Sequence, residues 1–266
     1  MPIRTFKRSI WMLIHKIFVS NEEVFSPHGI SIRIPKDADI DIRYLLARGR
    51  PYEAPEAEMV RKYISIGMSV IELGGCYGII SALIRKQIGP DAQHIIVEAD
   101  PSLAKVCASN ANLENTNNLA EVVVAAIDYS GAKKITFSPG QNAHGGRVAN
   151  DEERGFTVPT TTLTEQVSKL VEKEYILVCD IEGAELDLCQ NEKSALSKAY
   201  LVILETHPKI YPGKKLDYNQ IQTNIENAGL VEIEKLGAVV CFASKTAIKD
   251  LNPVSYTHLR AHETLL

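Results

Sequence analysis

The chain has 266 residues, of which 45% are hydrophobic, and its 29 basic and 33 acidic residues give a formal net charge of −4. This length suits one large domain with a sizeable core. The net negative charge gives no overall electrostatic attraction to nucleic acid or to an anionic membrane. Five cysteines without a CxxC pair indicate neither a disulfide framework nor a zinc site, so we expect a cytoplasmic protein and assign no metal ligands.

The first predicted element lies within residues 4–19, where Ile10, Leu13, Ile14 and Ile17 recur at helical spacing beside basic residues. No apolar run in the sequence approaches the roughly 20 residues that span a bilayer. We favour a helix packed on the domain. The alternative is an amphipathic helix that contacts a membrane surface or a partner protein.

Residues 29–42 alternate apolar and polar side chains around a proline-containing turn, which predicts a short hairpin. Helix and hairpin together make residues 1–50 a small N-terminal addition to a main domain over residues 51–253. The segment 254–266 resembles the translation of a sequencing adapter, so we treat it as a non-native tail.

A helix is predicted at residues 55–63, and from residue 68 onward strands alternate with helices, which is typical of a parallel sheet covered on both faces. Strands are predicted at residues 69–73, 94–98, 120–125, 175–180 and 200–205. Helices are predicted at residues 55–63, 79–88, 102–113, 163–171, 184–191 and 217–228. Two last strands, 230–235 and 238–243, predict a closing hairpin with an antiparallel last strand. The sequence thus predicts an α/β fold with a doubly wound, mostly parallel sheet.

A segment between residues 133 and 159 interrupts this alternation. It begins with a predicted strand at residues 134–137 and continues as a loop rich in glycine and asparagine. Long loops often contact substrates, so we expect His144 and Arg147 to contact the substrate.

The strand at residues 69–73 runs into a turn that contains Gly74, Gly75 and Gly78 and then directly into an apolar helix. Glycines there let the backbone turn sharply and let a ligand approach main-chain N–H groups. The turn alone also suits a nicotinamide enzyme. Glu72, just before the turn, favours a cation such as the amino group of S-adenosylmethionine, because a carboxylate would repel a diphosphate. A plain tight turn with a solvated Glu72 is the alternative.

The next strand ends at Glu98, in the sequence Glu98-Ala99-Asp100-Pro101. A carboxylate at this place can accept hydrogen bonds from both hydroxyls of a ribose. Asp100 and Pro101 are instead typical of a helix start. We therefore assign Glu98 to the cofactor ribose and Asp100 to the helix cap.

Three carboxylates, Asp180, Glu182 and Glu185, cluster where the predicted strand 175–180 meets a helix. Ligands of open α/β sheets bind at such strand ends. The cluster could abstract a proton, contact the methionine end of the cofactor, or coordinate a divalent metal. Glu182 and Glu185 could instead stabilise the positive helix N-terminus. We favour a function for Asp180 and leave both interpretations open for Glu185.

His207 follows the strand at residues 200–205 and lies at the same predicted edge of the sheet, close to Glu205. An unperturbed histidine pKa near neutrality suits a general base. A purely structural histidine is the equally weighted alternative.

The motifs, taken in order, resemble those of the FkbM family of methyltransferases from Tyr52 to Ala243. The matching segments are Tyr52-Glu53, residues 70–78, 97–101, 125–131, 160–163, 180–185 and 205–208. Their joint order and spacing carry the resemblance, because no single motif is specific.

The resemblance implies a seven-stranded, Rossmann-like class I methyltransferase fold that uses S-adenosylmethionine to methylate an oxygen. The acceptor would be a hydroxyl of a sugar, a glycan or a secondary metabolite. His207, Asp180 and Glu182 would form the catalytic group, with His207 or Asp180 taking the proton. The implied cofactor site consists of Glu53, Glu72, Gly74, Gly75, Gly78, Glu98, Ala99, Ala126, Ile127 and Asp180.

The chain departs from the family pattern at several positions. The family usually has Asp-x-Gly-Ala-Asn-x-Gly where this chain has Glu72, Gly75 and Cys76, and it often has Lys in place of Cys179. Without the Asn donor and the Lys charge, a non-catalytic module that binds a partner is one alternative. An NAD-dependent oxidoreductase on a similar fold is the other.

Overall fold

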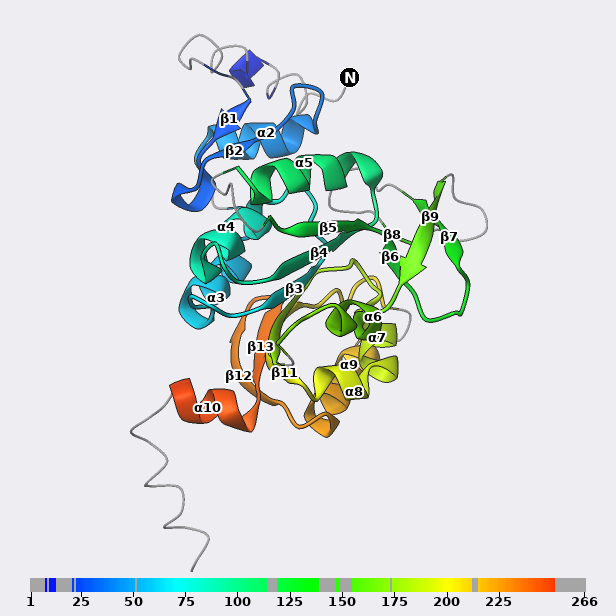
Figure 1. Ribbon diagram of the computed structural model, residues 1–266. Helices are drawn as coiled ribbons and strands as arrows, with labels where there is room; N and C mark the ends of the chain where they lie inside the picture. The colour runs from blue at the N-terminus through cyan, green and yellow to red at the C-terminus, as the bar shows by residue number, and fades with distance from the viewer. Residues whose placement is uncertain are drawn as a thin grey trace, which may run out of the picture.

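The computed structural model describes residues 8, 10–12, 21, 23–50, 52–113, 119–138, 147–148, 155–172, 174–211 and 215–251 (Figure 1). Most of the predicted N-terminal helix, most of the glycine-rich loop with His144, and the whole tail 254–266 lie outside these residues. In the described part of the chain, no helix is long and apolar enough to cross a membrane.

A seven-stranded sheet forms the centre of the molecule, in the order β12-β13-β11-β10-β3-β4-β5. The strands are β3 (Val70–Leu73), β4 (His94–Glu98), β5 (Glu121–Val124), β10 (Tyr175–Cys179), β11 (Ala199–Glu205), β12 (Val231–Leu236) and β13 (Val239–Ala243). β13 runs antiparallel to both β11 and β12, while the other neighbouring strands are parallel. The predicted mostly parallel sheet with an antiparallel last strand is confirmed.

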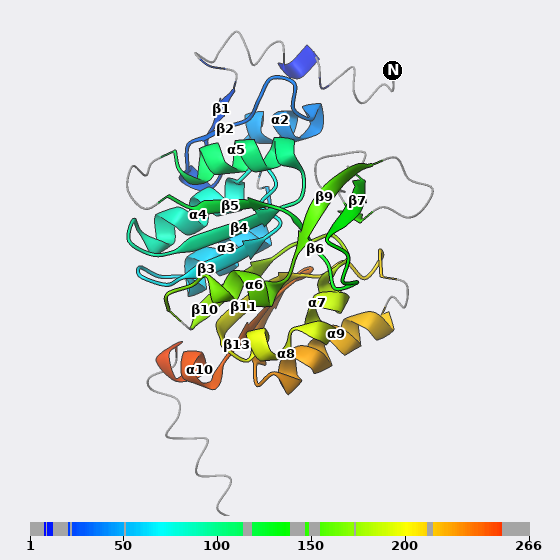
Figure 2. The same ribbon diagram turned by 45° about the vertical axis from the view of Figure 1, so that its right-hand side comes forward.

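Helices cover both faces of this sheet (Figures 1 and 2). One face carries α3 (Ala54–Tyr63), α4 (Ile79–Ile88), α5 (Pro101–Ala111) and α10 (Lys245–Leu251). The other carries α6 (Leu163–Ser168), α7 (Glu185–Asn191), α8 (Lys193–Leu196) and α9 (Lys215–Asn227). Successive strand residues point to opposite faces, so Val70 packs in one core cluster and Ile71 in the other. Asp100 caps α5, accepting from Ser102 N–H at 2.7 Å as its assignment required.

The predicted hairpin within residues 29–42 is wrong. β1 (Val24–Phe25) pairs with β2 (Ile32–Arg33), and a helix, α2 (Ile40–Ala47), begins where the second hairpin strand was expected. The Asp39 side chain accepts the Asp41 N–H at 2.7 Å and caps this helix. Ile42 and Leu46 are both buried one turn apart, so the apolar pattern is helical there. Trp11 packs edge-on against Tyr44 of α2, with ring centroids 5.6 Å apart.

A second, four-stranded sheet starts directly after β5, in the order β6-β9-β7-β8 (Figure 1). Its strands are β6 (Ala126–Ile127), β7 (Lys134–Ser138), β8 (Arg147–Val148) and β9 (Phe156–Thr161). β7 coincides with the predicted short strand, whereas β9 was not predicted. Because β6 follows β5 after a single residue, this accessory sheet begins at the carboxyl edge of the central sheet.

Candidate active site

The carboxyl ends of four parallel strands bring the predicted site residues to one edge of the sheet. Asp180 follows β10 and Glu205 ends β11, with Cys179 paired opposite Leu73 of β3 and Leu204 of β11. The neighbouring ends of β3 and β4 carry the glycine turn and Glu98. This is the edge at which open α/β sheets bind ligands.

The glycine turn lies against the end of β10. The Asp180 N–H donates to the Leu73 carbonyl at 2.9 Å. A Cβ on Gly74 would come within 1.8 Å of the Asp180 carbonyl oxygen, and a Cβ on Gly78 within 2.8 Å of the Cys107 Cα. Both glycines also have positive φ, 91° and 76°. Close packing of the turn therefore requires glycine at both positions.

Glu98 is buried and held by the turn that follows β3. Its Oε2 accepts the Cys76 N–H and its Oε1 accepts the Asp100 N–H, each at 2.8 Å. Burial raises the pKa of Glu98, and the N–H donors of Asp100, Cys76 and Ala99 act against that rise. A carboxylate has about four lone-pair sites, so these donors still leave it able to accept from a hydroxyl group.

The residues assigned to the adenine side form a separate apolar group. Ala99 and Ala126 are buried together with Val158 of β9. Ile127, the neighbour of Ala126, packs in the core on the α6–α9 face instead. The structure therefore brings Ala99 and Ala126 together at the start of the accessory sheet.

Glu72 points away from the end of β3 into the core, and its exposed fraction is 2%. Its Oε1 accepts the Ser81 hydroxyl at 2.8 Å, and its Oε2 lies 2.9 Å from His94 Nε2. Both carboxylate oxygens thus have protein partners. Glu72 still contributes to the wall of a small cavity beside Gly74 and Glu53.

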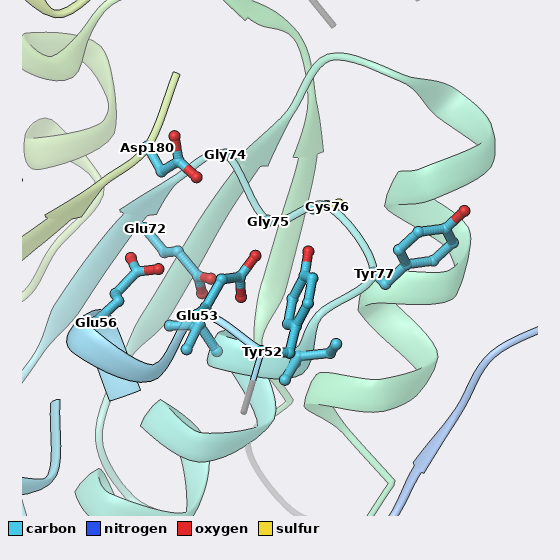
Figure 3. A pocket seen from close by; sticks show the side chains of 11 residues that line it. Tyr52, Glu53, Glu56, Glu72, Gly74, Gly75, Cys76, Tyr77 and Asp180 are labelled. Atoms are coloured by element: carbon cyan, nitrogen blue, oxygen red, sulfur yellow. The ribbon is translucent and has the colours of Figure 1, made fainter. Parts of the chain in front are cut away.

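An acidic cavity of about 300 Å³ opens at this edge of the sheet. It is lined by Tyr52, Glu53, Pro55, Glu56, Asp180, Glu182, Glu205, His207, Ala238 and Val239. The small cavity beside Gly74 has only about 10 Å³, which is room for roughly one water molecule. Figure 3 shows the carboxyl groups of Glu53 and Glu56 directed toward Asp180 and the glycine turn, while Tyr77 points away.

The start of α3 supplies two of these carboxylates. Glu53 is the N-cap of α3 and adopts a left-handed backbone with φ of 50°, and Glu56 lies in the first turn of the helix. Glu53 was predicted to be a site residue, whereas Glu56 was not. Residues three apart share a helix face, so the spacing of these two acids contained the signal.

Crowded carboxyl groups oppose one another's ionisation in this cavity. Burial raises the pKa values of Glu53 and Glu56 well above normal, with further rises from the charge of Asp180. Burial, followed by the charge of Glu205, raises the pKa of Asp180 to about 8. Asp180 Oδ1 is buried and has no hydrogen-bond partner among the described residues. A cationic group would stabilise all these carboxylates.

His207 lies between the carboxylates of the β10–α7 junction. Its Nδ1 is 2.9 Å from Glu185 Oε1, and its Nε2 is 3.5 Å from both Asp180 Oδ1 and Glu182 Oε2. Burial lowers the pKa of His207, but the carboxylates, Glu185 foremost, raise it to about 9. The structure thus brings together the predicted trio of His207, Asp180 and Glu182, together with Glu185.

Two triplets in the described residues place possible metal-ligand atoms within 4.8 Å of one another. One consists of Asp180, Glu185 and His207, and the other of Glu56, Asp180 and Glu205. Asp180 belongs to both triplets, which makes it the centre of the negative charge. Cys179, which replaces the family's usual Lys, is fully buried in the core behind Asp180.

Comparisons with known proteins identify the type of domain. The model of a family described as the methyltransferase FkbM domain matches residues 73–231, more than half of the chain. No curated protein sequence matches the chain.

Solved structures of methyltransferases are similar at low identity. A methyltransferase from Pyrococcus furiosus is 12% identical, covering 89% of this chain and 98% of its own, with a TM-score of 0.44. The O-methyltransferase TomG from Streptomyces achromogenes, involved in tomaymycin synthesis and solved with its cofactor, is 10% identical, covering 72% and 78%, with a TM-score of 0.41. Aeropyrum pernix fibrillarin, solved with S-adenosyl-L-methionine, is 11% identical, covering 68% of each chain, with a TM-score of 0.40.

Proposed function

The chain belongs to the FkbM family of methyltransferases, whose cofactor is S-adenosylmethionine, and from this premise we propose that it methylates a hydroxyl oxygen in the acidic cavity. The observation that carries the proposal is the orientation of His207, whose Nε2 faces Asp180 and Glu182 in that cavity. Family membership also decides against the NAD-dependent alternative.

The chemistry of the cavity fits this cofactor. When bound, S-adenosylmethionine supplies an electrophilic methyl group on a positively charged sulfonium, together with a cationic amino group. Asp180 Oδ1 is buried without a hydrogen-bond partner in the described residues, and the neighbouring carboxyl of Glu53 has a raised pKa. Both groups gain from a nearby cation, so they are the side chains that we assign to the methionine end.

The remaining cofactor contacts follow the order of the strand ends. We assign Glu98 to the ribose hydroxyls and Ala99 and Ala126 to the adenine side, and we leave out Ile127 because it packs in the core on the α6–α9 face. Gly74, Gly75 and Gly78 bring the turn close to the cofactor. Glu72 contributes its negative charge from behind the turn, because Ser81 and His94 occupy its oxygens.

His207 is our candidate for the general base, with Asp180 as the second candidate. A base within reach of the acceptor hydroxyl takes its proton as the oxygen attacks the methyl group, and such assistance typically contributes about 10²–10⁴-fold. Positioning of acceptor and cofactor supplies much of the remaining rate. A base whose pKa lies near or above neutrality favours an oxygen acceptor that must lose a proton.

We propose a hydroxyl of a sugar, a glycan or a secondary metabolite as the methyl acceptor. We propose the cytoplasm as the location of the protein. Peripheral contact with a membrane through residues 4–19 stays part of the proposal. Arg147, in β8 of the accessory sheet, is the candidate acceptor contact that lies in the described residues.

The first experiment is calorimetric titration of the full chain with S-adenosylmethionine and, separately, with NAD⁺. We expect micromolar affinity for the former, about −8 kcal/mol, and none for the dinucleotide. A screen of hydroxylated acceptors, with release of S-adenosylhomocysteine as the readout, then identifies the substrate class. A folded sample that binds neither cofactor would favour the non-catalytic binding module.

Two variants test the base. His207→Ala should bind S-adenosylmethionine within a few-fold of wild type if the fold is intact, whereas Asp180→Asn should weaken binding because it removes a charge assigned to the methionine end. At saturating S-adenosylmethionine, at least one of the two variants should lose turnover. Turnover near the wild-type value in both variants would exclude both residues as the base.

A further inference from the structure

Glu185 is the carboxylate closest to His207 and the most buried one near it, since its side chain is 0% exposed. Its Oε1 lies 2.9 Å from His207 Nδ1, and both its oxygens accept the Gly183 N–H, at 3.2 and 3.0 Å. Tyr211 also hydrogen bonds Glu185, and its hydroxyl accepts the His207 backbone N–H at 2.8 Å. Gly183 and Tyr211 therefore hold the Glu185 carboxylate in place beside the His207 ring.

We propose that Glu185 is the positioning residue of the His207 base: in the neutral ring it accepts a hydrogen bond from Nδ1–H, fixes that tautomer, and so directs the unprotonated Nε2 toward the acidic cavity. The proposal rests on the proposed function, because it assigns Glu185 a role in catalysis only through His207. It adds to that function by giving His207 the role of base and Glu185 the role of orienting it.

The local geometry distinguishes this role from simple stabilisation of a helix end. Glu185 begins α7, and an acid in the first turn of a helix interacts favourably with its N-terminus. Asp187, also in that first turn, can meet this need without being buried. A fully buried carboxylate is costly unless it is paired and hydrogen-bonded. Of the two side chains that hydrogen bond Glu185, His207 is the one that can carry a positive charge.

The proton transfer then balances at named atoms. The O–H bond of the acceptor breaks and an N–H bond forms at His207 Nε2, while Nδ1 keeps its proton toward Glu185. The imidazolium that results is stabilised by the Glu185 carboxylate. Asp180, Glu182 and Glu205 are the other carboxyl groups around this ring and add to the stabilisation, while the Tyr211 hydroxyl accepts the His207 backbone N–H.

The test is ¹⁵N NMR of the histidine rings in the full chain, without cofactor or acceptor, over pH 6 to 10.5. The spectrum of His207→Ala assigns the His207 signals. In wild type we expect the neutral ring to carry its proton on Nδ1. In Glu185→Gln, the amide can donate to Nδ1, so the ring should move toward the Nε2–H tautomer, and its pKa should fall by about one unit or more.

Glu182→Gln is the matched control, because Glu182 faces the other ring nitrogen at 3.5 Å. It should also lower the pKa of His207, since it removes a neighbouring negative charge, but it should leave the proton of the neutral ring on Nδ1. A purely structural role for Glu185 would move the melting temperature and not the tautomer. If Glu185→Gln does not fold, Glu185→Asp replaces it, with a weakened Nδ1–H bond and a mixed tautomer expected.

Two outcomes overturn the proposal. One is an unchanged His207 tautomer in folded Glu185→Gln or Glu185→Asp. The other is an equal change of tautomer in Glu182→Gln. Failure of the proposed function is a different result: full turnover in His207→Ala would remove the base, whatever the NMR shows, and with it the catalytic role of Glu185.

Discussion

Two histidine–carboxylate pairs of equal length occupy opposite situations in this molecule. Glu72 and His94 lie 2.9 Å apart beneath the central sheet, and their side chains are 3% and 0% exposed. Glu185 and His207 also lie 2.9 Å apart, but His207 is 14% exposed at the carboxyl edge of the sheet. We refer to them as the closed pair and the open pair.

The two pairs differ in what surrounds the rest of each side chain. In the closed pair, Ser81 occupies the second oxygen of Glu72, and the second ring nitrogen of His94, Nδ1, is buried without a hydrogen-bond partner in the described residues. In the open pair, the second ring nitrogen faces Asp180 and Glu182 across the acidic cavity. The distance between carboxylate and imidazole is therefore a poor guide to function. What distinguishes a structural pair from a reactive one is the environment of the imidazole nitrogen that does not contact the carboxylate.

Breaking the closed pair should have the largest effect on stability. His94→Ala leaves Glu72 Oε2 buried without its hydrogen-bond partner and leaves a cavity in the core, which together typically cost about 2–5 kcal/mol. Urea unfolding measures this loss, with Glu72→Gln as a milder control that can still bond Ser81 and His94. A loss below about 1 kcal/mol would contradict the structural role. S-adenosylmethionine should still bind the fraction of His94→Ala that remains folded.

Breaking the open pair should instead affect turnover. His207→Ala removes the proposed base, so we expect turnover of the acceptor found by screening to fall about 10²-fold or more. The unfolding free energy should fall less than in His94→Ala, because the His207 side chain is partly exposed and Glu185 keeps its hydrogen bonds with Gly183 and Tyr211. A variant that unfolds as readily as His94→Ala would show that the two pairs are equivalent.

The open pair should also make stability depend on pH. His207 has its pKa raised from 6.5 to about 9, so its contribution is complete below pH 6.5 and is lost as pH rises through about 9. Asp180, whose pKa is raised from 3.8 to about 8, binds its proton more tightly when folded, so that contribution is also lost as pH rises. The unfolding free energy should therefore fall by about 1–3 kcal/mol from pH 6.5 to 9.

Urea unfolding at several pH values measures this slope, and the double variant Asp180→Asn/His207→Ala is the control. Its curve should be flatter than that of wild type over the same interval, because neither titrating group remains. An unchanged slope in the double variant would place the titration elsewhere in the molecule.

Much of the central sheet could be predicted because local patterns and tertiary packing agree there. The helix predicted at residues 79–88 coincides with α4, since the glycine turn and an apolar run mark its start. The segment 29–42 was misassigned because alternation at Ile30, Ile32 and Ile34 was extended across the Asp39 cap. β9 was missed because Pro159 interrupts its Thr-rich sequence, and a proline within such a run weakens the prediction of a strand.

The site was predictable where strand order alone determines neighbours. Asp180 and His207 follow adjacent parallel strands, so their proximity follows from the topology. Glu56 could not be placed from strand order, because the docking of α3 against the sheet depends on packing along the whole helix. The inward direction of Glu72 follows from parity along β3, since it shares a face with Val70, and an expectation based on charge alone overlooked this.

A substitution at Cys76, in the glycine turn that follows β3, should have the smallest effect on the unfolding free energy. Cys76 has a φ of 45°, a left-handed conformation that costs most residues roughly 1–2 kcal/mol but that asparagine adopts readily. Family members usually have asparagine at this position, so Cys76→Asn should stabilise the fold by about 0.5–1 kcal/mol. Cys76→Ala is the control, because alanine gains nothing in that conformation.

Urea unfolding measures the stability of both variants. The NMR titration of His207 should be unchanged, since the Cys76 N–H donates to Glu98 and not to the open pair. A gain in both variants would mean that removal of the thiol matters and not the backbone, whereas a shifted His207 titration would mean that the turn and the open pair are coupled.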